Sequence, residues 1–285
     1  MKKTLILFML LSMMIYLCSC EGKKQEDIRV NRNIVNSMGN TLETRILPPG
    51  GYIRLSADAG SLTQFLRNYK MKEDGLSVLL YDGREKSNQS GHAAVFDLPI
   101  ENEDLQQCAD SVMRVYAEYY WNIGQADKIA FHFTDGFLCE YSKWREGYRV
   151  VADDSGTRWK KSAEYDDSYD SFVKYLRIVF SYAGTYSMEK YEAETIALSE
   201  MNVGDVILKG GSPGHVVMVV DICENSDGKK AFLLAQGYMP AQQFHVIKNP
   251  IHDKDPWYYE EEMSFPLQTA GYSFDSEGMI KRLIF

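Results

Sequence analysis

The sequence lacks any cluster of lysine and arginine. Its 285 residues include 40 acidic and 31 basic side chains, which give a formal charge of −9. Proteins that bind a nucleic-acid backbone do so with grouped Lys and Arg side chains that displace counterions. The composition therefore argues against a nucleic-acid partner.

Cysteines are few, and their spacing fits no zinc site. The chain has five of them and no C-x-x-C pair. If Cys18 is removed and Cys20 is modified, as argued below, three thiols remain at Cys108, Cys139 and Cys223, and three cannot all pair. A folded part of this size does not need disulfides, so we expect buried free thiols.

Motifs for metals and cofactors are also missing. His245 and His252 have no helical i, i+4 spacing to each other or to a carboxylate, so no metal site is indicated. The glycine-rich run 210–214 is not followed by the Lys-Ser/Thr pair of a phosphate loop, and it is typical of a turn. We expect no cofactor.

The N-terminus has the pattern of an exported protein. A basic pair at 2–3 precedes an apolar run over 5–17, and the segment ends in Leu-Cys-Ser-Cys at 17–20. The apolar run is shorter than the roughly 20 residues that span a bilayer, so the pattern predicts a cleaved signal peptide. An ordinary secretory signal that merely contains two cysteines is the alternative.

Leu-Cys-Ser-Cys resembles a bacterial lipobox. The resemblance implies a lipoprotein signal peptide over 1–19, cleavage before Cys20 and attachment of a diacylglyceryl group to the Cys20 thiol. The next residue is Glu21 rather than Asp, which by the same resemblance implies sorting to the outer membrane. We therefore expect a cell-envelope location, with the membrane as a partner through the N-terminal lipid.

The remaining chain divides into a tether and one domain. Residues 20–40 are polar and show no sustained apolar period, which is typical of a flexible tether behind the lipidated cysteine. Residues 41–285 contain no linker and no internal repeat, so we expect a single domain. Helices are predicted at 61–69, 101–122 and 168–183 and a strand at 77–81, whereas the last third is rich in strands. This order predicts an α+β fold with helices packed on an antiparallel sheet.

The candidate chemistry centres on His215. This residue follows the turn at 210–214 and opens an apolar strand, which places its ring at a sheet rim where it can act as a general base. Residues 204–236 resemble the histidine segment of NlpC-type and CHAP-type papain-like cysteine peptidases, which cleave cell-wall peptides. The resemblance implies a papain-like core, with Gln236 orienting His215. It also implies Cys108 as the nucleophile, since Cys108 is the only cysteine on a predicted helix.

The same residues also have a purely structural interpretation. Cys108 lies on the apolar stripe of the predicted helix 101–122, in its second or third turn, where the helix dipole lowers a thiol pKa little. Burial as a small apolar side chain is the expectation from this pattern. His215 could simply cap a strand end. His92 also opens a strand after a glycine, and His132 alternates with aromatic residues as a structural histidine does.

A second resemblance extends over nearly the whole mature chain. Five runs carry it, namely GHAAV at 91–95, DLQQCAD at 104–110, YSKWREGYR at 141–149, GSPGH at 211–215 and MPAQ at 239–242. They resemble an uncharacterised bacterial lipoprotein family that is known only as a domain of unknown function. The resemblance implies a lipoprotein with a single domain and lends no activity.

Three functions follow as alternatives. The first is a cysteine peptidase or amidase, or an inactive relative, that acts on peptidoglycan or other cell-envelope material. The second is a non-catalytic module that binds such material. The third, a carbohydrate-active enzyme, rests only on aromatic residues that could form a sugar-stacking surface, which are Trp144, Trp159, Trp257, Tyr258 and Tyr259.

Replacement of Cys20 tests the predicted anchor. Cys20→Ala removes the thiol that would carry the lipid, so the protein is expected to move to the soluble fraction. Fractionation of cells after a high-salt wash measures this. A variant that stays with the membrane would show that the lipobox interpretation is wrong.

Overall fold

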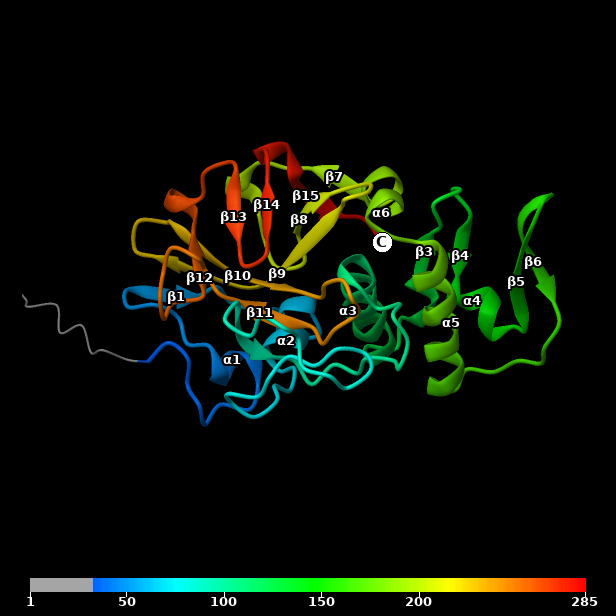
Figure 1. Ribbon diagram of the computed structural model, residues 1–285, viewed down its shortest axis with the longest axis horizontal. Helices are drawn as coiled ribbons and strands as arrows, with labels where there is room; N and C mark the ends of the chain where they lie inside the picture. Colours follow the sequence, from blue (N-terminus) through cyan, green and yellow to red (C-terminus); the bar gives the residue numbers. More distant parts are fainter. Residues whose placement is uncertain (1–32) are drawn as a thin grey trace, which may run out of the picture. The chain divides into compact units, whose positions relative to one another are not determined.

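A nine-stranded antiparallel sheet organises residues 33–285, which are the residues described by the computed structural model (Figure 1). This confirms the predicted α+β class with an antiparallel sheet. Along the main path the strands are β2 (His92–Val95), β11 (His245–Ile247), β10 (Lys230–Gln236), β9 (His215–Asn225), β8 (Val206–Lys209), β15 (Ile280–Leu283) and β7 (Ala193–Thr195). Beside this path, β1 (Tyr52–Arg54) pairs with β9, and β12 (Trp257–Tyr259) pairs with β10.

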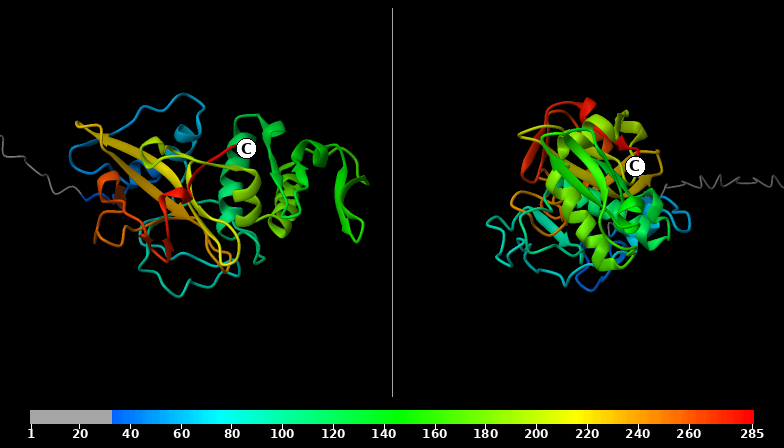
Figure 2. Two further views of the ribbon diagram at one scale, coloured as in Figure 1. Left: turned by 90° about the horizontal axis from the view of Figure 1, so that it is seen from above. Right: turned by 90° about the vertical axis from the view of Figure 1, so that its right-hand side faces the viewer.

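Helices and three two-stranded hairpins complete the described part. The helices are α1 (Leu42–Arg45), α2 (Leu62–Arg67), α3 (Cys108–Asn122), α4 (Tyr141–Arg145), α5 (Tyr169–Tyr182) and α6 (Thr185–Tyr191). The hairpins are β3 (Ala130–His132) with β4 (Leu138–Glu140), β5 (Tyr148–Asp153) with β6 (Gly156–Lys161), and β13 (Leu267–Thr269) with β14 (Tyr272–Phe274). The β5–β6 hairpin extends away from the main sheet (Figure 2). No helix within residues 33–285 has both the length and the apolar character needed to cross a bilayer.

Strand β9 divides the core between the two faces of the sheet. Successive side chains of a strand point to opposite faces. Val216, Met218 and Val220 accordingly belong to the cluster that includes α3. Val217 and Val219 belong to a second cluster on the other face, together with Phe274 of the β13–β14 hairpin. Both faces are therefore covered, which explains why the strand reads as a continuous apolar run rather than an alternating one.

The folded unit includes the last part of the predicted tether. Residues 1–32, which hold the predicted signal peptide and Cys20, lie outside the described residues. The last part of the predicted tether is folded, because the backbone N–H of Leu47 donates to Ile34 O over 2.7 Å, and that of Asn36 donates to Arg45 O over the same distance. Ile34 and Val35 also pack against the core. From Ile34 onward, the segment belongs to the folded unit.

Two predicted elements differ in their bounds. The predicted helix over 101–122 begins only at Cys108, because the side chain of Asp110 accepts the backbone N–H of Gln107 over 3.0 Å and caps the helix there. The strand expected near 77–81 is reduced to isolated bridges at Leu79 and Leu80. The start of the helix depends on a cap, and the extent of the strand depends on its pairing partners. Neither can be seen in the apolar pattern of the sequence.

A buried carboxylate joins the N-terminal segment to β9. Asp221 is fully buried on β9, and its two oxygens accept Arg54 Nε over 2.6 Å and Arg67 Nε over 2.8 Å. Arg54 lies on β1 and also binds Ile46 O, whereas Arg67 ends α2 and also binds Leu55 O. The ion pairs are largely shielded from water. Each of the three buried charges is therefore balanced by the others and not by solvent.

Loss of the Asp221 charge should destabilise the fold strongly. Asp221→Asn keeps the shape of the side chain but leaves two largely buried arginines without a counter-charge, and breaking such a pair costs about 3–5 kcal/mol. Urea denaturation measures the change in the free energy of unfolding. Asp227→Asn is the matched control, since Asp227 is exposed. Equal denaturation midpoints for the two variants would contradict the importance of this ion triad.

Candidate active site

Cys108 is the first residue of α3, and this helix packs against the sheet. Asp110 caps the helix by accepting the backbone N–H of Gln107, as described above. The predicted position in the second or third turn is therefore wrong, because the segment 101–107 does not continue the helix. At the first position the helix dipole favours a thiolate, which is the usual setting of a reactive cysteine.

Burial opposes this dipole at the Cys108 thiol. Desolvation, followed by the charge of nearby Asp110, raises the pKa of Cys108 to about 11. Hydrogen bonds from the backbone N–H groups of Ala109 and Val216 lower it in part. The resting protein therefore holds a neutral thiol at neutral pH.

His215 and Gln236 form the second half of the site. His215 begins β9, Gln236 ends β10, and His215 Nε2 lies 2.8 Å from Gln236 Oε1. The amide nitrogen of Gln236 donates to Ala270 O over 3.4 Å, so its oxygen faces the imidazole. A carbonyl oxygen can only accept, which requires His215 to donate from Nε2. The Nδ1 atom of a neutral His215 is then left as the basic nitrogen.

The thiol lies beside this histidine. The backbone N–H of Val216, the residue joined directly to His215, is close enough to the Cys108 thiol to lower its pKa. His215 and Gln236 thus meet at one end of β9 and β10, and the start of α3, which carries Cys108, packs against the chain that follows Gln236. Burial lowers the pKa of His215 to about 4, and the hydrogen bond with Gln236 offsets this only in part. The imidazole is consequently neutral and able to accept a proton at any pH above about 5.

Gly237 allows the strand end and the helix start to meet. A Cβ atom at this position would lie 2.1 Å from Ser111 Oγ and 2.7 Å from Gln107 O. Any side chain there would push the chain after Gln236 away from the first turn of α3. The glycine therefore sets the spacing between Gln236 and the segment that carries Cys108.

Aromatic rings enclose His215. The ring centroids of Tyr238 and Tyr272 each lie 4.8 Å from the imidazole centroid, and that of Phe274 lies 6.1 Å away. Tyr238 Oη donates to Gly271 O over 3.0 Å, which fastens the β13–β14 turn over the histidine. This cover leaves His215 only 2% exposed and accounts for its low pKa.

Sequence reasoning missed these covering residues. Tyr238 follows Gln236 by two positions, and this proximity was the one available signal. No sequence pattern pointed to Tyr272 or Asp110, since an isolated aromatic residue or acid is common in any sequence.

Asp110 is buried, and its Oδ1 atom has no hydrogen-bond partner among the described residues. Desolvation raises the pKa of Asp110 to about 8.

The other two described cysteines differ from Cys108. All three are free, but Cys139 and Cys223 are buried whereas Cys108 is partly exposed. The expectation of buried free thiols describes the first two. Among the described cysteines, Cys108 is the least buried.

The side chains of the remaining described histidines form no hydrogen bond with Cys108, His215 or Gln236, although His245 is the cross-strand neighbour of Gln236. His92 and His245 lie edge to face with ring centroids 6.2 Å apart, and His132 stacks on Tyr191. His252 pairs with Glu262 over 2.7 Å. Within residues 33–285, no group of three or more His, Cys, Asp or Glu side chains is arranged to hold a metal ion.

The aromatic residues considered for sugar stacking do not form one surface. Trp257 is fully buried and its Nε1 donates to Leu47 O. Tyr258 and Trp144 are buried as well, with exposed fractions of 2% and 5%. These side chains build the core and are not available to a ligand.

Fold and site together define an α+β protein in which a cysteine at a helix start meets a histidine and a glutamine on adjacent strands. The family described as "Domain of unknown function (4846)" matches residues 42–281, and the chain belongs to this family. No curated protein and no solved structure matches the chain.

Alkylation tests the accessibility and the charge of the thiol. Iodoacetamide is expected to label Cys108 in the native protein and to spare Cys139 and Cys223, which serve as internal controls. Because a thiol of pKa about 11 is neutral at pH 7, the rate should rise about tenfold per pH unit from 7 to 9. Peptide mass spectrometry after timed labelling measures each site. A rate that is already constant between pH 6 and 8 would show that a thiolate is present at rest.

Proposed function

We propose that the protein is a cysteine hydrolase that cleaves an amide bond in cell-envelope peptides. The observation that carries this proposal is the 2.8 Å contact between His215 Nε2 and Gln236 Oε1 beside a cysteine at the first position of a helix. Such an arrangement supplies a nucleophile, a base and a group that orients the base. The local resemblance of residues 204–236 to NlpC-type peptidases supports the choice of substrate.

The residues suggest a definite sequence of proton transfers. As Cys108 Sγ attacks the amide carbonyl, its proton passes to Nδ1 of His215. The imidazolium then returns that proton to the leaving amine, and the acyl group stays on sulfur as a thioester. Water, deprotonated by His215, releases the acid and regenerates the thiol. Gln236 keeps Nε2 occupied throughout, so that Nδ1 is the atom that exchanges protons.

The aromatic cover favours a second candidate function. Tyr238 and Tyr272 leave little room for water around His215, and burial keeps both the thiol and the imidazole neutral. A related protein that has kept this fold but lost enzymatic activity would have the same buried, neutral thiol and imidazole. In that case, the protein is a non-catalytic module that binds cell-envelope material.

The location of the protein is also a proposal. The signal-peptide pattern and Cys20 support an exported lipoprotein held at the outer membrane, and both lie outside the described residues.

Turnover of cell-wall peptides tests the enzyme. Incubation with purified peptidoglycan, followed by mass spectrometry of the soluble products, is expected to reveal new amide cleavage. Cys108→Ala should lower the rate by at least about a thousandfold, because removal of a nucleophile abolishes the covalent route. Cys223→Ala, which removes a buried thiol away from the site, is the matched control and should retain activity.

The pH profile separates a catalytic histidine from a structural one. Because the unprotonated imidazole is the base and its pKa is about 4, activity should fall only as the pH drops through about 4. Gln236→Glu places a carboxylate against Nε2, which stabilises the imidazolium and should shift this limb to higher pH. Absence of cleavage by the wild type, or equal cleavage by Cys108→Ala, would reject the enzyme and leave the binding module.

A further inference from the structure

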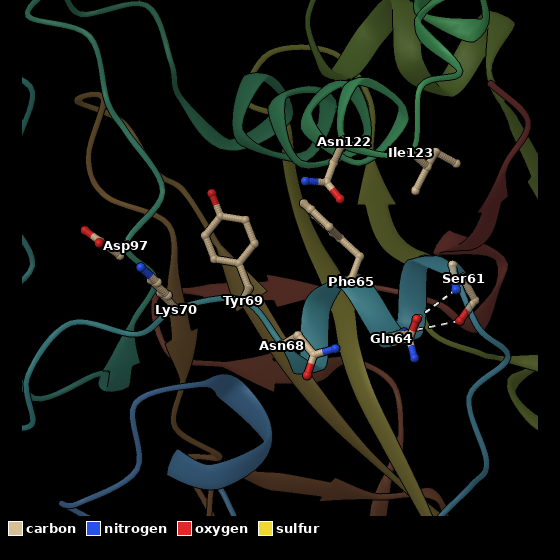
Figure 3. Close-up of a pocket in the computed structure, with 10 residues that line it drawn as sticks. Ser61, Gln64, Phe65, Asn68, Tyr69, Lys70, Asp97, Asn122 and Ile123 are labelled. Atoms are coloured by element: carbon tan, nitrogen blue, oxygen red, sulfur yellow. Dashed lines mark hydrogen bonds between the residues drawn. The ribbon is translucent and has the colours of Figure 1, made fainter.

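A second pocket lies at the other end of α3. It has a volume of about 380 Å³ and sits between α2 and the last turn of α3 (Figure 3). This is within the range of about 300–1,000 Å³ that is usual for small-molecule sites. Its lining residues are Gly60, Ser61, Gln64, Phe65, Asn68, Tyr69, Lys70, Asp97, Asn122 and Ile123.

Two aromatic rings form the apolar part of the pocket. Phe65 and Tyr69 lie edge to face with centroids 5.4 Å apart, and Figure 3 shows both rings below Asn122. Tyr119 of α3 fixes this wall, because its Oη donates to Gly60 O over 2.9 Å and its ring lies 5.7 Å from that of Phe65. These contacts hold the wall in place.

Three carboxamides surround these rings. Asn68 and Asn122 are exposed, and neither side chain has a hydrogen-bond partner among the described residues. Gln64 uses its oxygen to accept Gly60 N–H over 2.7 Å, which leaves its amide nitrogen available. A carboxamide both donates and accepts, and so does a hydroxyl group. This lining therefore suits a ligand that carries several hydroxyl groups.

The charges of the pocket cancel. Lys70 and Asp97 lie side by side through the backbone bond from Asp97 N–H to Lys70 O, and they form no ion pair within the described residues. One positive and one negative group give no net attraction for an anion or a cation. An uncharged ligand fits this balance, and each charged group can form a strong hydrogen bond with a hydroxyl group.

We propose that this pocket binds an uncharged saccharide unit. The exposed parts of the two rings offer apolar contact to the C–H groups of a sugar, and the carboxamides and the two charged groups pair with its hydroxyls. The site is separate from the thiol, since Cys108 and Asn122 occupy opposite ends of a 15-residue helix, about 20 Å apart at 1.5 Å per residue. The inference does not depend on catalysis at Cys108.

Calorimetric titration with neutral trisaccharides tests the site. The probes are the trimer of N-acetylglucosamine and maltotriose, titrated into the protein without its signal peptide. Saturable binding of at least one is expected. Preference for the first would assign a glycan with acetamido groups, and preference for the second would assign one with hydroxyls only.

Substitutions in the pocket give the decisive comparison. Asn68→Ala and Asn122→Ala each remove one hydrogen-bonding side chain and should weaken binding about fivefold. Asn102→Ala is the matched control, because Asn102 is exposed and does not line the pocket. Cys108→Ala should also bind normally, which separates this site from the proposed catalytic one.

Three results would overturn the proposal. The first is the absence of saturable binding of either trisaccharide to the wild type. The second is binding that both pocket variants retain at full strength. The third is tighter binding of a trimer of galacturonic acid or of a zwitterionic dipeptide, since either would show that Lys70 or Asp97 selects a charged ligand.

Discussion

The buried carboxylate of Asp221 fixes the relation between the sheet and the first helices. It lies on β9, the strand that His215 begins, and it holds Arg67 at the end of α2, the helix that lines the second pocket. A buried charge is balanced by oppositely charged or hydrogen-bonding groups, and these groups must stay in fixed positions. Strand β9 and its ion pairs therefore support both proposed sites, since one site includes the first residue of β9 and the other is lined by the helix that Asp221 holds.

Two physical effects compete at Cys108, and burial wins. The dipole at a helix start stabilises an anion by up to about 2 kcal/mol in partly buried settings. Removal of a thiolate from water costs more here, since the pKa of Cys108 rises to about 11 in spite of the dipole and the backbone donors. Tyr238 and Tyr272 have a similar effect at His215, since they cover the imidazole, exclude water from it and lower its pKa. Whatever lifts that cover would admit water and move both pKa values toward their ordinary range.

The sequence predicted the class of fold better than it predicted the local contacts. Apolar periodicity located the body of α3 and the strand after His215, since both patterns follow directly from burial. It misplaced the start of α3, because the cap between Gln107 and Asp110 is a local hydrogen bond that apolar spacing does not record. Tyr272 and the second pocket could not be found, since long-range packing alone brings their residues together. The sugar-stacking surface failed for the same reason, as Trp257 and Tyr258 pack inward.

The length of α3 sets the distance between the two proposed sites in this protein. The helix carries the thiol on its first residue and a wall of the pocket on its last, and no hinge interrupts it. Insertion or loss of a single residue would turn one end by 100° relative to the other and shift it by about 1.5 Å. Side chains along the helix can vary as long as they pack. The number of residues between Cys108 and Asn122, in contrast, sets both the distance and the relative rotation between the thiol and the pocket wall.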